Sequence, residues 1–128
     1  MARSALHSDD APKAIGPYSQ AVQVDAGKLT FLSGQIPLDP ATMEIVAGDV
    51  TAQAERVMLN LQAVLKAGGL EFSHVVRSTI FLTNLGDFQK VNEIYGRFFQ
   101  GAPPARVTVQ VSALPRGSQV EIDAICVS

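Results

Sequence analysis

The segment Val75–Thr83 constrains the fold most, because its β-branched and aromatic residues place large apolar side chains on both faces of a strand. Side chains alternate along a strand, so Ile80 and Leu82 lie on one face while Val75 and Phe81 lie on the other. A strand that is apolar on both faces has to be covered on both sides. We therefore expect helices on one face of its sheet and another subunit on the opposite face.

Two helical patterns flank this strand. The first opens at Asp49 and ends at Gly68-Gly69, where glycine supplies a left-handed residue. The second runs from about Asp87 to Gln100 and ends abruptly before two prolines, because proline disfavours the helical conformation in the residue that precedes it. The predicted buried positions recur at helical spacing and are Ala54, Val57, Met58, Leu61, Val64 and Leu65 in the first helix, and Phe88, Val91, Tyr95, Phe98 and Phe99 in the second.

The region before the first helix predicts a hairpin. Two β-rich runs, Ser19–Val24 and Leu29–Ser33, surround a turn with a glycine, and a short edge strand is expected at Glu44–Ala47 after a proline-containing loop. Residues 1–12 are polar and small, and we expect a loosely held arm. With 128 residues and no internal repeat, the chain is expected to form one α+β domain over residues 1–128.

The region after the second helix predicts another hairpin, formed by Ala105–Ser112 and Gln119–Val127. A regular six-residue link would place Gln110 opposite Glu121. Three charged residues inside these apolar strands, namely Arg106, Glu121 and Asp123, would then project from the same face. A charge in such a position is costly unless it is paired or functional, so both a cross-strand ion pair and a polar site remain open at this point.

Composition excludes several classes of function. The net charge is −2 and the cations are scattered, which argues against binding to nucleic acid or to an anionic membrane. A single cysteine, Cys126, excludes an intrachain disulfide, and no apolar run is long enough to span a membrane. With no secretory signal either, we expect a cytoplasmic protein. His7 and His74 are far apart in sequence and lack further ligands at useful spacing, so neither a metal nor a cofactor is expected.

Five motifs in order along the chain resemble the Rid (RidA/YjgF) family of enamine and imine deaminases, whose older label is endoribonuclease L-PSP. The resemblance covers about residues 12 to 127. The motifs are the segments 14–21 (AIGPYSQA), 33–37 (SGQIP), 87–95 (DFQKVNEIY), 104–106 (PAR) and 120–125 (VEIDAI).

This resemblance implies a chorismate-mutase-like α+β fold, with a mixed sheet, two helices packed on one face, and a homotrimer with active sites between subunits. It also implies hydrolysis of 2-aminoacrylate and 2-iminobutanoate, released by pyridoxal-phosphate enzymes, to 2-oxo acids and ammonia. In that reaction Arg106 binds the substrate carboxylate and Glu121 holds or activates water. The residues expected to line the pocket with Arg106 are Tyr18, Ser33, Gly34, Asn92 and Thr108.

The residues themselves suit this chemistry. The planar fork of Arg106 matches a carboxylate bidentately, and a carboxylate such as Glu121 can act as a general base. Four residues along a strand span about 13 Å, so we expect the two side chains to flank a small cavity rather than to form a salt bridge. Thr108 stands where many members of the family have cysteine, which excludes a thiol at that position. The alternatives are a non-catalytic, chaperone-like or regulatory protein that binds small acids, and a ribonuclease, which the acidic charge and the shortage of histidine disfavour.

Overall fold

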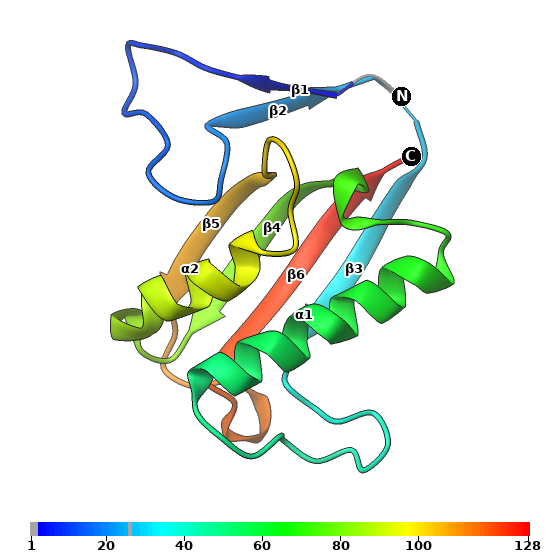
Figure 1. Ribbon diagram of the computed structural model, residues 1–128, viewed down its shortest axis with the longest axis vertical. Helices are drawn as coiled ribbons and strands as arrows, with labels where there is room; N and C mark the ends of the chain where they lie inside the picture. The colour runs from blue at the N-terminus through cyan, green and yellow to red at the C-terminus, as the bar shows by residue number, and fades with distance from the viewer. Residues whose placement is uncertain (1–2, 26) are drawn as a thin grey trace.

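The computed structural model describes residues 3–25 and 27–128. Within these residues, a mixed four-stranded sheet in the order β3-β6-β4-β5 carries α1 and α2 on one face, and β1 and β2 form a separate two-stranded sheet (Figure 1). This arrangement confirms the predicted α+β class. The elements are β1 (Arg3–Leu6), β2 (Ala21–Val24), β3 (Leu29–Gln35), α1 (Val50–Ala67), β4 (Val75–Leu82), α2 (Phe88–Gly96), β5 (Ala105–Gln110) and β6 (Val120–Val127).

The predicted hairpin of β5 and β6 is wrong. β5 pairs with β4 in parallel, whereas β6 lies between β3 and β4 and is antiparallel to both. Parallel neighbours need a crossover, and α2 provides it between β4 and β5. The chain then passes the end of β4, where the Val111 amide donates to the Leu82 carbonyl and the Thr83 amide donates to the Gln119 carbonyl. The link between β5 and β6 therefore crosses the sheet instead of closing a tight turn.

The predicted hairpin of β2 and β3 is also wrong, although both strands exist. β2 pairs with β1, from Arg3 opposite Val24 to Leu6 opposite Ala21, and β3 pairs with β6. The first part of the expected loose arm is thus a strand. Met1 and Ala2 of that arm lie outside the described residues, as does Ala26 in the predicted turn.

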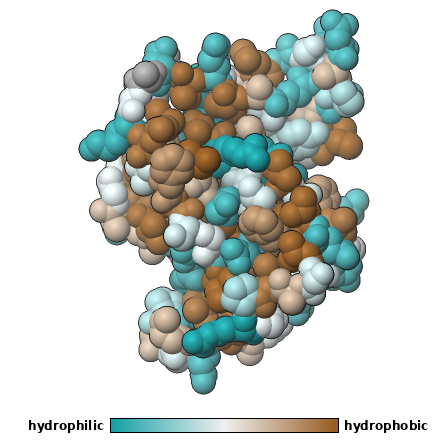
Figure 2. Space-filling model, turned by 180° about the vertical axis from the view of Figure 1, so that it is seen from behind, coloured by the Kyte–Doolittle hydropathy of each residue, from teal (hydrophilic) through white to brown (hydrophobic). Residues whose placement is uncertain are grey.

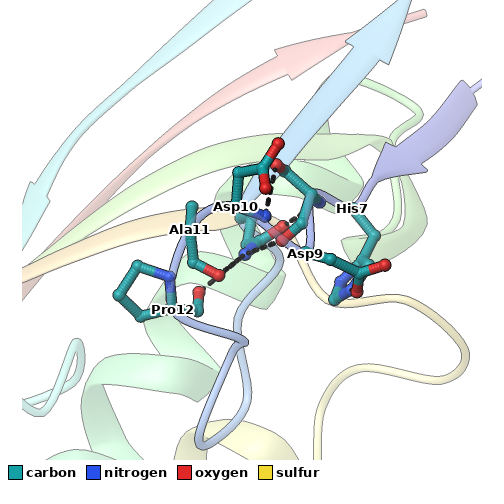
Figure 3. A network of polar contacts seen from close by, with 7 residues as sticks. His7, Asp9, Asp10, Ala11 and Pro12 are labelled. Atoms are coloured by element: carbon teal, nitrogen blue, oxygen red, sulfur yellow. Dashed lines mark hydrogen bonds and ion pairs between the residues drawn. The ribbon is translucent and has the colours of Figure 1, made fainter.

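Gln20 holds the remainder of the N-terminal segment. Its side-chain amide donates to the carbonyl of Pro12 at 2.6 Å and to that of Ser8 at 3.2 Å, and its carbonyl oxygen accepts from the Ser8 amide at 2.7 Å. A hydrogen bond also joins His7 Nε2 to Asp9 Oδ1 at 2.9 Å within the same loop (Figure 3). The side chain of Gln20, in the motif 14–21, therefore fixes the backbone of residues 8–12, although the composition of this segment predicts a loosely held arm.

The predicted edge strand at Glu44–Ala47 is reduced to a single bridge between Ile45 and Leu38. The loop is closed by backbone bonds instead, in which the Asp39 amide donates to the Glu44 carbonyl and the Val46 amide donates to the Pro37 carbonyl. Two residues of pairing are too few for a strand, because Pro37 and Pro40 remove donors from this stretch.

Local signals set the ends of α1. The Asp49 carboxylate accepts from the amides of Thr51 at 3.1 Å and Ala52 at 3.2 Å, and Gly69 ends the helix region with φ +69°. Val64 was expected to be buried but is 42% exposed, because it lies at the border of the apolar stripe. The core between α1, α2 and the sheet contains Leu32, Val50, Ala54, Val57, Met58, Leu61, Leu65, Ile80, Leu82, Val91, Ile94, Tyr95, Val120 and Ile122.

α2 is shorter than expected and ends at Gly96 rather than near Gln100. Phe98 and Phe99 follow the helix and pack against the core as partly buried side chains. A helix of nine residues already presents Val91, Ile94 and Tyr95 to the sheet, so its apolar face is complete before the two phenylalanines. No helix among the described residues is both long and apolar enough to cross a membrane.

The face of the sheet opposite the helices is open in the single chain. Several of its apolar side chains are exposed. They include Phe31 on β3, which is 69% exposed, and Val107 and Val109 on β5. Figure 2 views the molecule from behind and shows apolar residues spread across this side with polar residues between them. Large apolar side chains gathered on one exposed face indicate an interaction surface. The expected second cover of β4 is therefore not supplied by the part of the chain that the structure describes.

The cap of α1 yields a first testable prediction. Substitution Asp49→Ala removes the acceptor for two amides at the helix start and should lower the free energy of unfolding by about 1 kcal/mol. The measurement is the urea midpoint at one fixed protein concentration, with an unchanged slope. Asp49→Asn keeps a side-chain oxygen and should lose much less, so an equal loss in both variants would contradict a role as hydrogen-bonding cap.

Candidate active site

Arg106 lies near the start of β5, an edge strand of the main sheet, and points to the helix-covered face. Its guanidinium carbon lies 5.5 Å from the ring centroid of Tyr18, 5.6 Å from that of Phe88 and 5.2 Å from that of Tyr95. Aromatic faces attract a cation through their quadrupoles. The side chain is therefore held in a cage of three rings rather than extended into solvent.

The rings come from two different segments. Phe88 and Tyr95 are seven residues apart on α2, which places them two turns apart on the same helix face. Tyr18 comes from the loop before β2, and its neighbour Ser19 ties this loop to the start of β5. There the Ser19 amide donates to the Pro104 carbonyl at 3.1 Å and its hydroxyl donates to the Pro103 carbonyl at 2.5 Å.

The cage leaves the charge of Arg106 without a counterion. No carboxylate among the described residues lies within ion-pair distance of it, and its Nη1 is buried without a hydrogen-bond partner there. Burial lowers the pKa of Arg106, and the nearby tyrosines oppose this shift. Arginine nevertheless remains protonated at neutral pH. A partly buried cation with no ion-pair partner among the described residues is rare in proteins, and it favours an anionic ligand at this position.

Two further polar groups near the cage are also unsatisfied. Asn92 Oδ1 and Thr108 Oγ1 are buried without a hydrogen-bond partner among the described residues. Asn92 lies one turn after Phe88 in α2, and Thr108 lies two residues after Arg106 on the same face of β5. Buried polar groups are normally paired, so three unpaired groups in one region indicate a place for a ligand. Together they offer a charged donor, an amide acceptor and a hydroxyl.

The roles of Phe88 and Tyr95 in the cage were missed in the sequence, where both appeared as core positions of a helix. They are packed against the core, but they also face the guanidinium. Tyr95 carried one signal, because a buried tyrosine hydroxyl needs a partner. That partner is the hydroxyl of Ser78 on β4, at 2.6 Å. Phe88 has no polar atom and gave no signal beyond its helical spacing.

Glu121 lies on the opposite face of the sheet from Arg106, so the expectation that they share a face is wrong. Cross-strand partners share a face, and Arg106 is paired with Ser78 of β4, whereas Glu121 is paired with Phe81. Ser78 and Phe81 are three residues apart, an odd number, and therefore point to opposite sides. The cause is the position of β6, which is a neighbour of β4 and not of β5. Gln110 does not face Glu121 but pairs with Leu82.

Gly34 lies beside Glu121 and directly follows Ser33, at an irregularity in the pairing of β3 with β6. A Cβ built on Gly34 would collide with the carboxylate of Glu121 and lie 2.9 Å from its Cδ. The absence of a side chain at Gly34 thus makes room for this carboxylate. Asp123, the third charged candidate, has a structural role, because its Oδ1 accepts from the Thr79 amide at 2.9 Å.

The predicted site residues, joined by Phe88 from the cage, therefore form two separate groups in one chain. We call them the arginine group, on β5, α2 and the loop before β2, and the glutamate group, on β3 and β6. The arginine group consists of Tyr18, Phe88, Asn92, Arg106 and Thr108, and the glutamate group of Ser33, Gly34 and Glu121. β3 and β5 are at opposite edges of the main sheet (Figure 1), so one chain does not bring the two groups together.

Comparison with known proteins places this chain in a family. The family model described as endoribonuclease L-PSP matches residues 8–128. The chain belongs to the Rid (RidA/YjgF) family. Its relatives include a protein from Myxococcus xanthus named DfrA, 83% identical over 128 residues, which are 100% of this chain and 98% of that protein.

Two further Rid relatives carry more informative names. The 2-iminobutanoate/2-iminopropanoate deaminase of Mus musculus is 50% identical over 125 residues, which are 98% of this chain and 91% of the mouse protein. The crystal structure of RidA from an Antarctic Psychrobacter species has a TM-score of 0.76 and 42% identity, and the match covers 98% of this chain and 99% of that one. The fold, and not only the motifs, is therefore that of a Rid protein.

The environment of Tyr95 yields a prediction about stability at high pH. Burial raises the pKa of Tyr95 from 10.0 to about 12, so the folded chain holds this proton more tightly than the unfolded chain. The resulting stabilisation, on the order of 2 kcal/mol, is fully present below pH 10 and is lost as the pH rises through about 12. Urea unfolding at several pH values in this window measures the loss.

The matched variant is Tyr95→Phe, which keeps the ring but removes the titrating hydroxyl. It should be less stable than the wild type at neutral pH, because the hydroxyl of Ser78 loses its partner, and its stability should fall less steeply above pH 10. An equally steep decline in both proteins would assign the loss to other groups, such as Cys126, whose pKa burial raises to about 11.

Proposed function

We propose that this chain hydrolyses small imines of 2-oxo acids, and that Arg106 binds the carboxylate of the substrate. The observation that supports this most is the half-buried guanidinium of Arg106, which is caged by three rings, has a buried Nη1, and has no carboxylate partner among the described residues. The substrates we propose are 2-aminoacrylate and 2-iminobutanoate, as released by pyridoxal-phosphate enzymes. The name of the mouse relative supports this choice of substrate class.

The arginine group suits a small 2-imino acid. The fork of Arg106 can donate two parallel hydrogen bonds to a carboxylate, and the rings restrict the orientations that the guanidinium can adopt. Asn92 Oδ1 can accept from the imine or enamine nitrogen, and the hydroxyl of Thr108 can donate to a carboxylate oxygen. Arg106 Nη1, Asn92 Oδ1 and Thr108 Oγ1 each lack a hydrogen-bond partner among the residues that the structure describes, so the substrate would satisfy donors and acceptors that are already desolvated.

We propose that the water-activating carboxylate comes from a second subunit. Glu121 lies on the open face of its own sheet, and Arg106 lies on the helix-covered face, so the two cannot flank one small molecule within a chain. The exposed apolar side chains on the open face supply the surface through which copies would pack. In a homotrimer, the glutamate group of one subunit would meet the arginine group of the next, giving three sites between subunits.

The reaction then needs little from the protein beyond positioning and proton transfer. The enamine 2-aminoacrylate tautomerises to 2-iminopropanoate, whose C2 is electrophilic. Glu121 accepts a proton from a water molecule as the oxygen adds to C2, which gives a carbinolamine. The proton passes to the nitrogen, and as the C–N bond breaks the hydroxyl group of the carbinolamine gives up its proton and becomes the carbonyl group, so that ammonia and the 2-oxo acid leave. Water is the second substrate, and each step conserves atoms and charge.

Mixed assemblies test this proposal. Arg106→Ala and Glu121→Gln should each lower kcat/KM for 2-iminobutanoate hydrolysis by about a hundredfold or more, because one loses the carboxylate anchor and the other the base. Co-expression of the two inactive chains should restore about a quarter of the wild-type sites. In randomly assembled trimers, about that fraction of sites combines an intact Arg106 from one kind of chain with an intact Glu121 from the other. A coupled assay with a serine or threonine dehydratase measures the rate.

The control is the double variant Arg106→Ala/Glu121→Gln co-expressed with wild-type chains in the same ratio, which should show a similar fraction of intact sites. If the two single variants fail to complement each other while the control assemblies are active, the site is not shared between subunits. If Arg106→Ala alone clears 2-aminoacrylate at the wild-type rate, Arg106 is not the anchor and the proposed function fails. Binding of 2-oxobutanoate without any acceleration of imine hydrolysis would instead favour a ligand-binding regulator.

Gly34 yields a more local prediction. Gly34→Ala should lower kcat/KM at least about tenfold, because the new methyl group would displace the Glu121 carboxylate from its position. Gly68→Ala is a matched control, since a Cβ at Gly68 meets no atom closer than 3.5 Å. Both variants are assayed for imine hydrolysis and for thermal unfolding. Full activity in Gly34→Ala would show that the placement of this carboxylate is not critical.

A further inference from the structure

A groove of about 920 Å³ lies away from both groups of the candidate active site, between α1 and the segments that follow α1 and α2. Its residues come from four places: Arg3 on β1, the outer face of α1, the stretch Gly69–Ser73, and the chain from Phe98 to Gln100. None of them belongs to the arginine group or the glutamate group. The volume is within the range of pockets that hold small organic molecules.

Aromatic and aliphatic side chains form the floor of this groove. The ring of Phe72 lies 5.3 Å from that of Phe98 and 5.4 Å from that of Phe99, with interplanar angles of 56° and 76°. Such tilted and edge-on contacts leave ring edges and faces available to a further ring. Leu59, on the outer face of α1, adds apolar surface and is 41% exposed. The floor thus favours an apolar, ring-sized group.

The rim of the groove is positively charged, although the chain as a whole carries −2. Arg3, Arg56 and Lys66 line it, against one acid, Glu71. No ion pair joins these three cations to a carboxylate among the described residues. The charges on this rim are therefore available to an anion.

Arg3 is the most specific of these cations. Its Nη1 donates to the Ser73 carbonyl at 3.2 Å, which fixes the guanidinium at the groove, while its Nη2 is buried and has no partner among the described residues. Burial also lowers the pKa of Arg3, as expected for a cation that is partly desolvated and unpaired. An N–H group in this state gains most from a charged acceptor.

From this geometry we propose that the groove is a second binding site, separate from Arg106, for an organic carboxylate with an aromatic tail. The ring lies on the phenylalanine floor, and the carboxylate accepts from Arg3 Nη2 with Lys66 nearby. Charge complementarity selects an anion, and the depth of apolar surface selects a tail over a bare inorganic ion. This site does not depend on the proposed imine hydrolysis, because no residue is shared.

The groove is in contact with the cage of Arg106 through one pair of rings. Phe99, which lines the groove, lies 4.7 Å from Tyr95, and Tyr95 faces the guanidinium of Arg106. Resonances of Tyr95 can therefore report on both sites. The substitution Arg106→Ala removes binding at the first site and isolates the second.

The test titrates 3-phenylpropanoate into full-length Arg106→Ala protein, followed by calorimetry and by NMR shifts of Gly69 and Ser73. We expect saturable binding of one molecule per chain with a Kd on the order of 1 mM, a usual strength for a ligand of this size. Arg3→Met and Lys66→Glu should each weaken it at least about fivefold, whereas Lys90→Glu, an exposed lysine of α2 outside the groove, should leave it unchanged. The neutral analogue 3-phenylpropan-1-ol should bind at least about tenfold more weakly.

Three results would overturn the proposal. One is the absence of saturable binding in the Arg106→Ala protein when the wild type binds, because binding would then belong to the first site. Another is affinity that neither Arg3→Met nor Lys66→Glu changes, with both variants shown to be folded by their NMR spectra. The third is a change of oligomeric state in Lys66→Glu, measured by sedimentation velocity, because the groove would then be a contact between protein chains.

Discussion

The position of β6 between β3 and β4 decides how the chemistry of this chain is arranged. Because α2 returns the chain to the far side of β4, β5 becomes a parallel edge strand and the last strand enters on the other side. Arg106 and Glu121 are then on different strands, on opposite faces, with β4 between them. No adjustment of side-chain rotamers can bring them to one small molecule. The pairing of the strands therefore keeps the arginine group and the glutamate group apart within one chain.

The arginine group holds the guanidinium of Arg106 partly desolvated, with no counterion among the described residues. Removing a guanidinium from water costs several kcal/mol, whereas contact with aromatic faces returns about 0.5 to 2 kcal/mol. The cost of desolvating the guanidinium of Arg106 is thus only partly offset in the free chain, and a bound carboxylate would lower its free energy further. A glutamate placed beside Arg106 would have stabilised the free chain and removed this preference. The three rings hold the cation in position without neutralising it.

The sequence predicted well what short-range physics determines. The cap at Asp49, the glycine end of α1 and the two apolar faces of β4 all depend on residues close together in the chain, and the structure confirms them. Both hairpin predictions assumed that strands next to each other in sequence pair, but here β2 pairs with β1, β3 with β6 and β5 with β4. That choice depends on packing between distant elements, which a local pattern does not contain.

The same limit applies to the candidate site. Arg106 stood out because a charge in an apolar strand is costly, and its isolation in the structure agrees with that signal. Asp123 gave an equal signal, yet its carboxylate accepts from a backbone amide of the adjacent strand. Only tertiary structure separates a charge that is paired from one that is not. The role of Phe88 and Tyr95 in the cage could not be predicted for a related reason. The sequence pattern of a helix face that packs on a sheet is the same whether or not a cation lies against it.

β5 links the candidate site to the surface through which we propose that the chains assemble. Its alternation places Arg106 and Thr108 on the helix-covered face, and Val107 and Val109 on the open face. The residues that would bind substrate and the residues that would bind a neighbouring subunit thus share one short backbone. In the proposed trimer, burial of the open face both removes apolar surface from water and carries Glu121 to a neighbour's arginine. A folded monomer would keep the anchor for a small acid but would lack the carboxylate that activates water, so hydrolysis would require assembly.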